Sequence, residues 1–131
     1  MPIRIMIVDD SPAMRRFIDR TIQLSGLDVT ECVEAADGRE ALDILRAVGA
    51  DVVVSDINMP CMTGEELLHA IRDDTQLRAT PVLVVSTDST DARMTRMMRL
   101  GATGYIKKPF TPEMLRGELE RVLGTLPCLK S

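Results

Sequence analysis

Polar and charged residues stand directly after apolar segments at four points of the sequence. Asp9 and Asp10 follow the first apolar segment, and Asp56 ends the third. Ser86 follows the fourth segment, and Lys108 follows the fifth. Three carboxylates that lie close together need a cation or raised pKa values. Carboxylate oxygens favour a hard ion such as Mg²⁺, which accepts its remaining oxygens from water or a phosphate group. The pattern therefore predicts a magnesium site that binds a phosphoryl group.

Asp56 is the candidate acceptor for that phosphoryl group. A carboxylate can act as the nucleophile and form an aspartyl phosphate, and phosphoryl transfer asks the protein mainly for positioning and charge neutralisation. The transferred group adds negative charge and three acceptor oxygens. We expect Mg²⁺, the Lys108 ammonium and the Ser86 hydroxyl to satisfy those oxygens.

Five apolar, β-branched segments alternate with segments whose apolar residues recur at helical spacing. The predicted strands span residues 3–8, 29–35, 51–56, 82–85 and 105–107. Ser11-Pro12 and Thr111-Pro112 each place an N-cap before a favoured first helical residue, and residues 37–40 resemble a capping box. This alternation predicts an α/β fold with a doubly wound parallel sheet.

The predicted helices carry apolar stripes, of which the fourth and the first bear on function and packing. On the fourth helix, the Met residues at 94, 97 and 98 favour core packing over a partner surface. The stripe predicted for the first helix is Phe17, Ile18, Ile22 and Leu24.

The strand–helix repeats also predict where the polar residues meet. Right-handed crossovers leave helices on both faces of the sheet, and five units are too few to close an eightfold barrel. The sheet should stay open, and in such sheets ligands bind beyond the carboxyl ends of the strands. The acidic residues, Ser86 and Lys108 all belong to that edge.

Length, composition and charge narrow the class of protein. The 131 residues, 45% of them hydrophobic and with a net charge of -4, predict one soluble globular domain. An isoelectric point near 5.0 disfavours binding to nucleic acid or anionic membranes. Cys32, Cys61 and Cys128 form no CxxC pair, so a reducing cytoplasm is expected. No apolar stretch has the length of a signal peptide core or a membrane span.

Four motifs, taken in order, resemble the receiver domain of two-component response regulators. They are Val8-Asp9-Asp10-Ser11, Ser55-Asp56-Ile57-Asn58-Met59-Pro60, Val85-Ser86-Thr87 and Lys108-Pro109-Phe110, and the resemblance covers residues 3–124. The resemblance implies a (βα)5 flavodoxin-like fold with strand order 2-1-3-4-5. It also implies a cis peptide bond between Lys108 and Pro109.

The same resemblance implies roles for the acidic residues. Asp56 would accept the phosphoryl group from the phosphohistidine of a sensor histidine kinase. Asp9 and Asp10, together with Asp56 and the main-chain carbonyl of Asn58, would hold Mg²⁺.

The resemblance further implies a switch and an output surface. Ser86 and Lys108 would contact the phosphoryl group, after which Ser86 moves toward it and Tyr105 turns inward. A downstream protein would bind the face made by the fourth helix, fifth strand and fifth helix. Residues of that face expected to change exposure are Met94, Met97, Tyr105, Lys107 and Met114.

Three positions are expected to tune the lifetime of the acyl phosphate. Thr87 is larger than the Ala or Gly often found after the hydroxyl residue in the family, and would restrict access of the donor. Asn58 and Asp88 would influence how water reaches the acyl phosphate.

The chain most resembles chemotaxis-type single-domain receivers, which bind a flagellar switch or pass phosphate onward. We therefore expect a signalling module that acts through another protein, in chemotaxis or a phosphorelay, and not an enzyme. One alternative is a phosphatase with an aspartyl nucleophile, but Asn58 stands where its second acid is required. Another is an FMN-binding flavodoxin-like protein, but the chain lacks the phosphate loop and the aromatic stackers.

Overall fold

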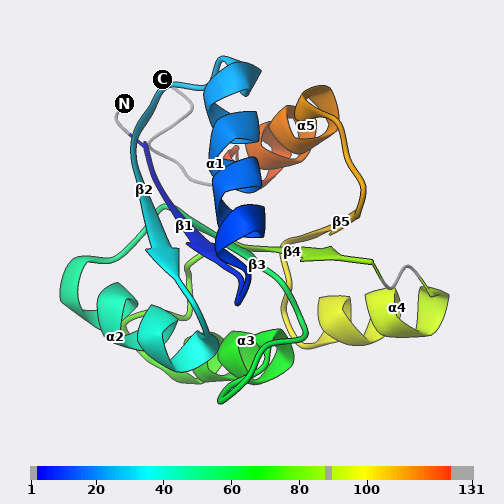
Figure 1. Cartoon of the computed structure of the whole chain (residues 1–131). Coiled ribbons are helices and arrows are strands. Elements are labelled where there is room, and N and C mark those ends of the chain that lie inside the picture. Colours follow the sequence, from blue (N-terminus) through cyan, green and yellow to red (C-terminus); the bar gives the residue numbers. More distant parts are fainter. Residues whose placement is uncertain (1–2, 88–89, 125–131) are drawn as a thin grey trace.

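The computed structural model describes residues 3–87 and 90–124 and contains one open parallel sheet (Figure 1). Its strand order is β2-β1-β3-β4-β5, which confirms the predicted order. The strands are β1 (Ile3–Val8), β2 (Val29–Ala35), β3 (Val52–Ser55), β4 (Val82–Ser86) and β5 (Gly104–Lys107). Every neighbouring pair is parallel, so all strands deliver their carboxyl ends to one edge.

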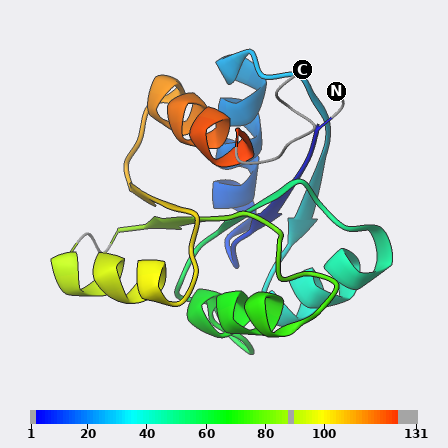
Figure 2. The same ribbon diagram turned by 180° about the vertical axis from the view of Figure 1, so that it is seen from behind.

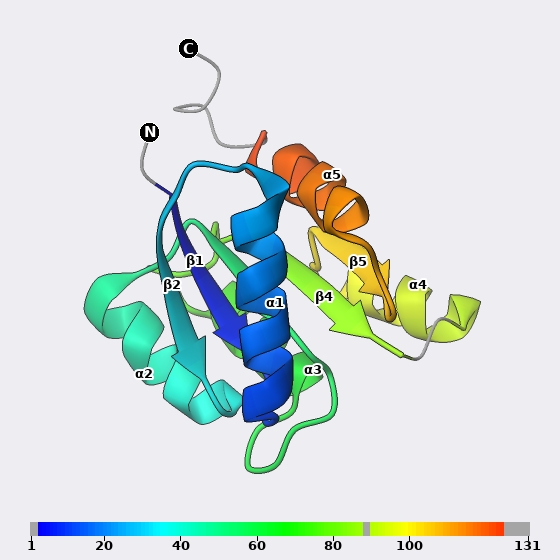
Figure 3. The same ribbon diagram turned by 45° about the horizontal axis from the view of Figure 1, so that its top comes forward.

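Helices cover both faces of this sheet. They are α1 (Pro12–Ser25), α2 (Gly38–Val48), α3 (Gly64–Asp73), α4 (Asp91–Arg99) and α5 (Pro112–Leu123). Helices α1 and α5 lie on one face, and α2, α3 and α4 lie on the other, as the opposite views show (Figures 1 and 2). The tilted view shows α1 and α5 side by side in front of the sheet (Figure 3). The doubly wound α/β prediction is confirmed.

The strands are buried from both sides because each face has its own apolar core. Alternate strand residues point to opposite faces, so Met6 and Val53 join the core under α2, α3 and α4. Ile7 and Val54 join the core under α1 and α5. Burial on both faces explains why these strands are continuous apolar runs in the sequence.

Some predicted strand boundaries are wrong by one or two residues. The segment 51–56 pairs only over Val52–Ser55, and the Asp51 carboxylate, just before this strand, accepts the Arg4 N–H at 2.7 Å. Ser86 belongs to β4, since it pairs with Lys107 of β5.

The helix starts follow the predicted capping chemistry with one change. The Ser11 side chain accepts the Met14 N–H and caps α1. Asp37 accepts the Glu40 N–H at 2.9 Å at the start of α2. The reciprocal capping box is formed at α3, where Thr63 and Glu66 exchange hydrogen bonds of 3.0 and 3.2 Å.

The predicted stripe of α1 is only half right. Ile18 and Ile22 are buried, whereas Phe17 and Leu24 are 48% and 70% exposed. At 3.6 residues per turn, Ile18 and Ile22 share one face, and the two polar buried residues of α1, Thr21 and Ser25, complete it.

On α4 the methionines also divide. Met97 is buried in the core, and Met94 and Met98 are exposed.

Within the described residues, no helix is long and apolar enough to span a membrane.

Candidate functional site

The pairing of β1 with β3 brings the acidic residues together. Val8 pairs with Ser55 at the end of this ladder, so the next residue of each strand is an aspartate. The Asp56 N–H donates to the Val8 carbonyl at 2.9 Å. One carboxylate oxygen each from Asp9, Asp10 and Asp56 lies within 4.8 Å of the others. The predicted convergence of the three carboxylates is therefore found.

The three carboxylates differ in exposure. Asp9 is buried, Asp56 is intermediate and Asp10 is exposed. The Asp9 carboxylate accepts the Ser11 N–H at 2.9 Å, and its main-chain N–H donates to Ala35 of β2 at 3.1 Å. Asp9 is thus the fixed member of the cluster, and Asp10 is the member open to solvent.

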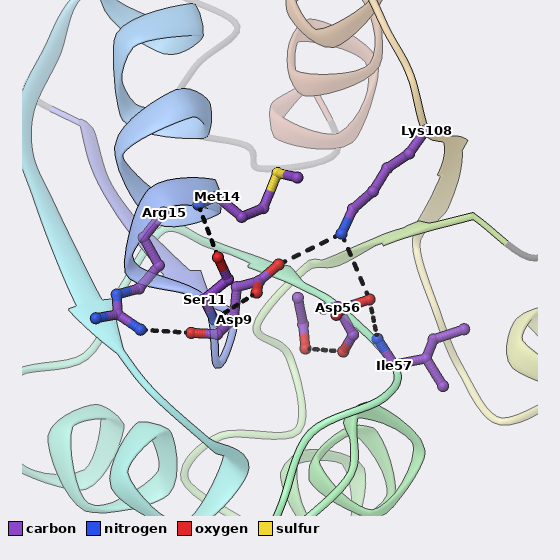
Figure 4. A network of polar contacts seen from close by, with 8 residues as sticks. Asp9, Ser11, Met14, Arg15, Asp56, Ile57 and Lys108 are labelled. Atoms are coloured by element: carbon purple, nitrogen blue, oxygen red, sulfur yellow. Dashed lines mark hydrogen bonds and ion pairs between the residues drawn. The ribbon is translucent and has the colours of Figure 1, made fainter.

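Lys108 reaches this cluster from the end of β5. Its Nζ lies 3.4 Å from Asp9 Oδ2 and 3.7 Å from Asp56 Oδ1 (Figure 4). Its main-chain N–H donates to the Ser86 carbonyl at 2.8 Å, and the following peptide bond to Pro109 is cis, as expected. One ammonium group therefore faces two carboxylates.

Asp56 is poised between opposing electrostatic influences. Burial, the largest of them, raises its pKa above the ordinary value. The Lys108 ammonium and the Ile57 N–H, which donates to Asp56 Oδ1 at 2.8 Å, act in the opposite direction. Asp9 and Asp10 raise the pKa again through like-charge repulsion. The three carboxylates outnumber the one ammonium group of Lys108, so the cluster is net negative and a bound cation would relieve the repulsion.

The donor set suits a hard divalent cation. Three carboxylates of mixed exposure offer only oxygen ligands, and such ligands suit Mg²⁺, Ca²⁺ or Mn²⁺. Mg²⁺ commonly uses one or two protein carboxylates and keeps several waters, which fits a cluster that is open on the side of Asp10. Asn58, the further predicted ligand, is exposed in the loop between β3 and α3.

The predicted hydroxyl and aromatic residues occupy the neighbouring strands. Ser86 is buried at the end of β4, and Thr87 directly after it is exposed. Tyr105 pairs with Val84 across β4 and β5 and packs, partly buried, against the core under α2, α3 and α4. Asp88 lies outside the described residues.

Two residues of the site were not found from the sequence. Arg15 of α1 donates from Nη1 to the main-chain carbonyl of Asp9 at 2.6 Å. Gly64 opens α3 so close to β3 that a side chain there would overlap the main-chain oxygen of Asp56. The sequence signals are the arginine four residues after the Ser11 cap and the glycine after Thr63. Neither signal reveals a main-chain partner.

Residues 5–120 match the response regulator receiver domain. The chemotaxis protein CheY1 of Helicobacter pylori is 38% identical over 124 residues, which cover 94% of this chain and 98% of that protein. The chemotaxis protein CheY of Pseudomonas aeruginosa is 38% identical over 120 residues, covering 92% of this chain and 95% of that protein.

Among solved structures, the chemotaxis response regulator CheY4 of Vibrio cholerae superposes with a TM-score of 0.83. It is 39% identical, and the match covers 93% of this chain and 99% of that one. The family match, the similar chemotaxis proteins and the superposed structure all agree with the fold and with the acidic cluster at the sheet edge. The chain belongs to the response regulator receiver domain family.

Proposed function

We propose that Asp56 is the phosphoacceptor of this response regulator and that the donor is the phosphohistidine of a sensor histidine kinase. The observation that carries the proposal is the position of the Asp56 carboxylate, at the end of β3 and beside Asp9, Asp10 and Lys108. A carboxylate in this setting has a cation partner on one side and candidate metal ligands on the other.

In the proposed transfer, an Asp56 carboxylate oxygen attacks the phosphorus of the phosphohistidine. The new O–P bond forms as the P–N bond breaks, and the imidazole keeps the bonding electron pair and takes up a proton from solvent. Lys108 binds the incoming phosphoryl oxygens, since its ammonium already faces the acceptor at 3.7 Å. Ser86, held one strand away, offers its hydroxyl to the same group.

We assign Mg²⁺ to the acidic cluster, with Asp9, Asp10, Asp56 and the main-chain carbonyl of Asn58 as its protein ligands. When bound, this ion supplies positive charge to the phosphoryl oxygens and so lowers the barrier to transfer. The donor chemistry and the net negative charge of the cluster support this assignment. Asn58, Thr87 and Asp88 are proposed to tune the lifetime of the acyl phosphate.

The proposed output face lies on α4, β5 and α5. Met94 of α4 and Met114 of α5 are exposed, as is Lys107 of β5, whereas Met97 is buried and contributes packing in this state. Ser86 and Tyr105 connect the acceptor to the face, because they lie on the adjacent strands β4 and β5. A movement of Ser86 toward the phosphoryl group would let Tyr105 turn inward and change this face for a downstream protein.

We further propose that the receiver domain spans residues 1–124, followed by a tail at 125–131, and that it acts in chemotaxis or motility. The named relatives are chemotaxis proteins that match over nearly their whole length, which supports this pathway over a general phosphorelay. On this proposal the chain is a signalling module that promotes only its own phosphorylation and dephosphorylation.

The acceptor assignment is tested with acetyl phosphate and Mg²⁺, followed by mass spectrometry of the intact protein. We expect a gain of one phosphoryl group in the wild type and none in Asp56→Asn. Asp73→Asn is the matched control, because Asp73 is an exposed carboxylate on α3, and it should still be labelled. A mass gain that survives Asp56→Asn would remove the assignment.

The same samples separate a signalling module from a phosphatase. A module is labelled once and returns slowly to the free state, whereas a phosphatase turns over small phosphoesters many times. Repeated turnover that depends on Asp56 would overturn the non-enzymatic assignment and leave the acceptor assignment intact.

A further inference from the structure

Arg15 ties three segments together next to the acidic cluster. From the second turn of α1 its Nη1 donates to the main-chain carbonyl of Asp9 at 2.6 Å (Figure 4). Its Nε pairs with Glu34 Oε1 of β2 at 2.9 Å. The Arg15 side chain is only 16% exposed, against 41% for Glu34. Because an arginine presents its donors in a rigid fork, these two contacts fix the plane of the guanidinium.

The carbonyl that Arg15 holds belongs to the peptide that joins Asp9 to Asp10. Peptide groups are planar, so holding this oxygen also sets the direction in which the chain enters Asp10. The Asp9 side of the peptide is fixed independently, through its bonds to Ala35, Ser11 and Lys108.

Asp10 depends on this restraint. Its side chain is exposed, and in the described part of the chain no hydrogen bond or ion pair holds its carboxylate. The direction of its Cα–Cβ bond, from which the carboxylate extends, is set by its own backbone. Yet a carboxylate oxygen of Asp10 lies within 4.8 Å of the other two acids.

We propose that Arg15 is a positioning residue that aims the Asp10 carboxylate at the metal. The inference rests on the proposed Mg²⁺ site and adds a residue to its support. Groups that orient metal ligands commonly contribute 10- to 100-fold to metal affinity. An ordinary ion pair on the surface contributes little to stability. Arg15 differs in two ways: its shorter contact is with the main-chain carbonyl of Asp9, and its side chain is largely covered.

The sign of the effect distinguishes positioning from charge. Removing a positive charge near a cation site strengthens cation binding by Coulomb's law. Loss of the restraint on Asp10 weakens it. Arg15→Gln therefore weakens Mg²⁺ binding if Arg15 positions Asp10 and tightens it if Arg15 acts only as a charge.

Arg16 provides the matched control. It carries the same charge on the same helical turn and is exposed. We expect Arg16→Gln to leave Mg²⁺ affinity unchanged or slightly tighter.

The experiment is calorimetric titration of Mg²⁺ into the full chain without a phosphodonor. We expect Arg15→Gln to weaken binding about 10-fold. In an Asp10→Asn background the same substitution should have no further effect, because the ligand that Arg15 positions is already lost. Unchanged or tighter binding in Arg15→Gln overturns the inference, and so does an equal loss in the Asp10→Asn background.

If circular dichroism shows that Arg15→Gln does not fold, a second variant tests the inference. Arg15→Lys keeps the charge and most of the apolar stem but loses the fork, and it should also weaken Mg²⁺ binding; unchanged affinity overturns the inference. If the wild type itself binds no Mg²⁺, the proposed metal site fails, which is distinct from a wild type that binds and an Arg15 variant that binds equally well.

Discussion

The Lys108 ammonium lies 3.4 Å from a carboxylate oxygen of Asp9, a residue 99 positions earlier in the chain. This ion pair is largely covered, with 13% of the Lys108 side chain and 2% of the Asp9 side chain exposed. Lys108 is the cation that the structure places against the buried acid, and the balance of charge at the sheet edge depends on it.

Replacing Lys108 with Met should destabilise the metal-free protein by about 1–2 kcal/mol, because it leaves carboxylates facing one another without a partner. Added Mg²⁺ should restore most of this stability, because the missing Lys108 ammonium no longer repels the ion. Urea unfolding with and without Mg²⁺ measures both effects. Lys107→Met, at the exposed neighbouring position, is the control. An equal deficit with and without Mg²⁺ would contradict the charge-balance account.

Gly64→Ala should destabilise the fold by about 1–3 kcal/mol through overpacking. A Cβ atom there overlaps the Asp56 main-chain oxygen, and relief requires the loop after β3 to move. The Gly64 N–H, which donates to the Ile57 carbonyl at 2.7 Å, would move with it. Acetyl phosphate labelling of Asp56 should slow in parallel.

Gly117→Ala gives the contrast, because nothing lies within 4 Å of a Cβ atom at this α5 position. It should raise stability by about 0.5–1 kcal/mol, the usual difference between Ala and Gly inside a helix. Thermal unfolding of the two variants side by side should give shifts of opposite sign. A stabilised Gly64→Ala protein would show that the close approach to Asp56 is easily relaxed.

Arg72→Met should lower the free energy of unfolding by about 2 kcal/mol, because several main-chain carbonyls lose their hydrogen-bond donor at once. The guanidinium donates to Thr80 at 2.6 Å and to Gly101 and Arg78 at 3.0 Å. It thereby joins the end of α3, the approach to β4 and the turn after α4. Arg78→Met is the control, because its side chain is exposed, and it should change the urea midpoint little. Similar losses of stability in both variants would rule out the carbonyl contacts as the cause.

Cys32 should resist alkylation across the neutral range. Burial, with help from Asp19 and Glu34, raises the pKa of this β2 thiol from 9.0 to about 12. The reactive thiolate fraction at pH 8 is then lower by about a thousand-fold than for a thiol with the ordinary value. Its iodoacetamide rate should rise about tenfold per pH unit up to pH 11, whereas exposed Cys61 should react at pH 8. Peptide mapping reports each cysteine separately, and early modification of Cys32 would contradict its raised pKa and partial burial.

The sequence predicted those features that depend on local pattern. Continuous apolar runs mark strands buried on both faces, and aspartates at the ends of two such runs meet once β1 pairs with β3. The side chains of Phe17 and Leu24 were predicted wrongly, because apolar character alone does not reveal which side of α1 meets the sheet.

The missed site residues share a different cause. Arg15 and Gly64 act on main-chain oxygens of Asp9 and Asp56, and every residue offers such an oxygen. Only the path of the backbone through the two turns selects these partners. Residue type and spacing thus indicated the candidate site side chains, and tertiary structure was needed to find what holds them.

The strand order has a consequence for the protein during its synthesis. Among the described strands, β1 comes first in the chain and lies inside the sheet, and the acidic cluster beyond its carboxyl end is completed by Lys108, directly after β5. A nascent chain on the ribosome therefore carries both halves of the acidic cluster well before it carries their counter-cation. The charge balance at this edge is therefore complete only in a chain that has been translated past Lys108.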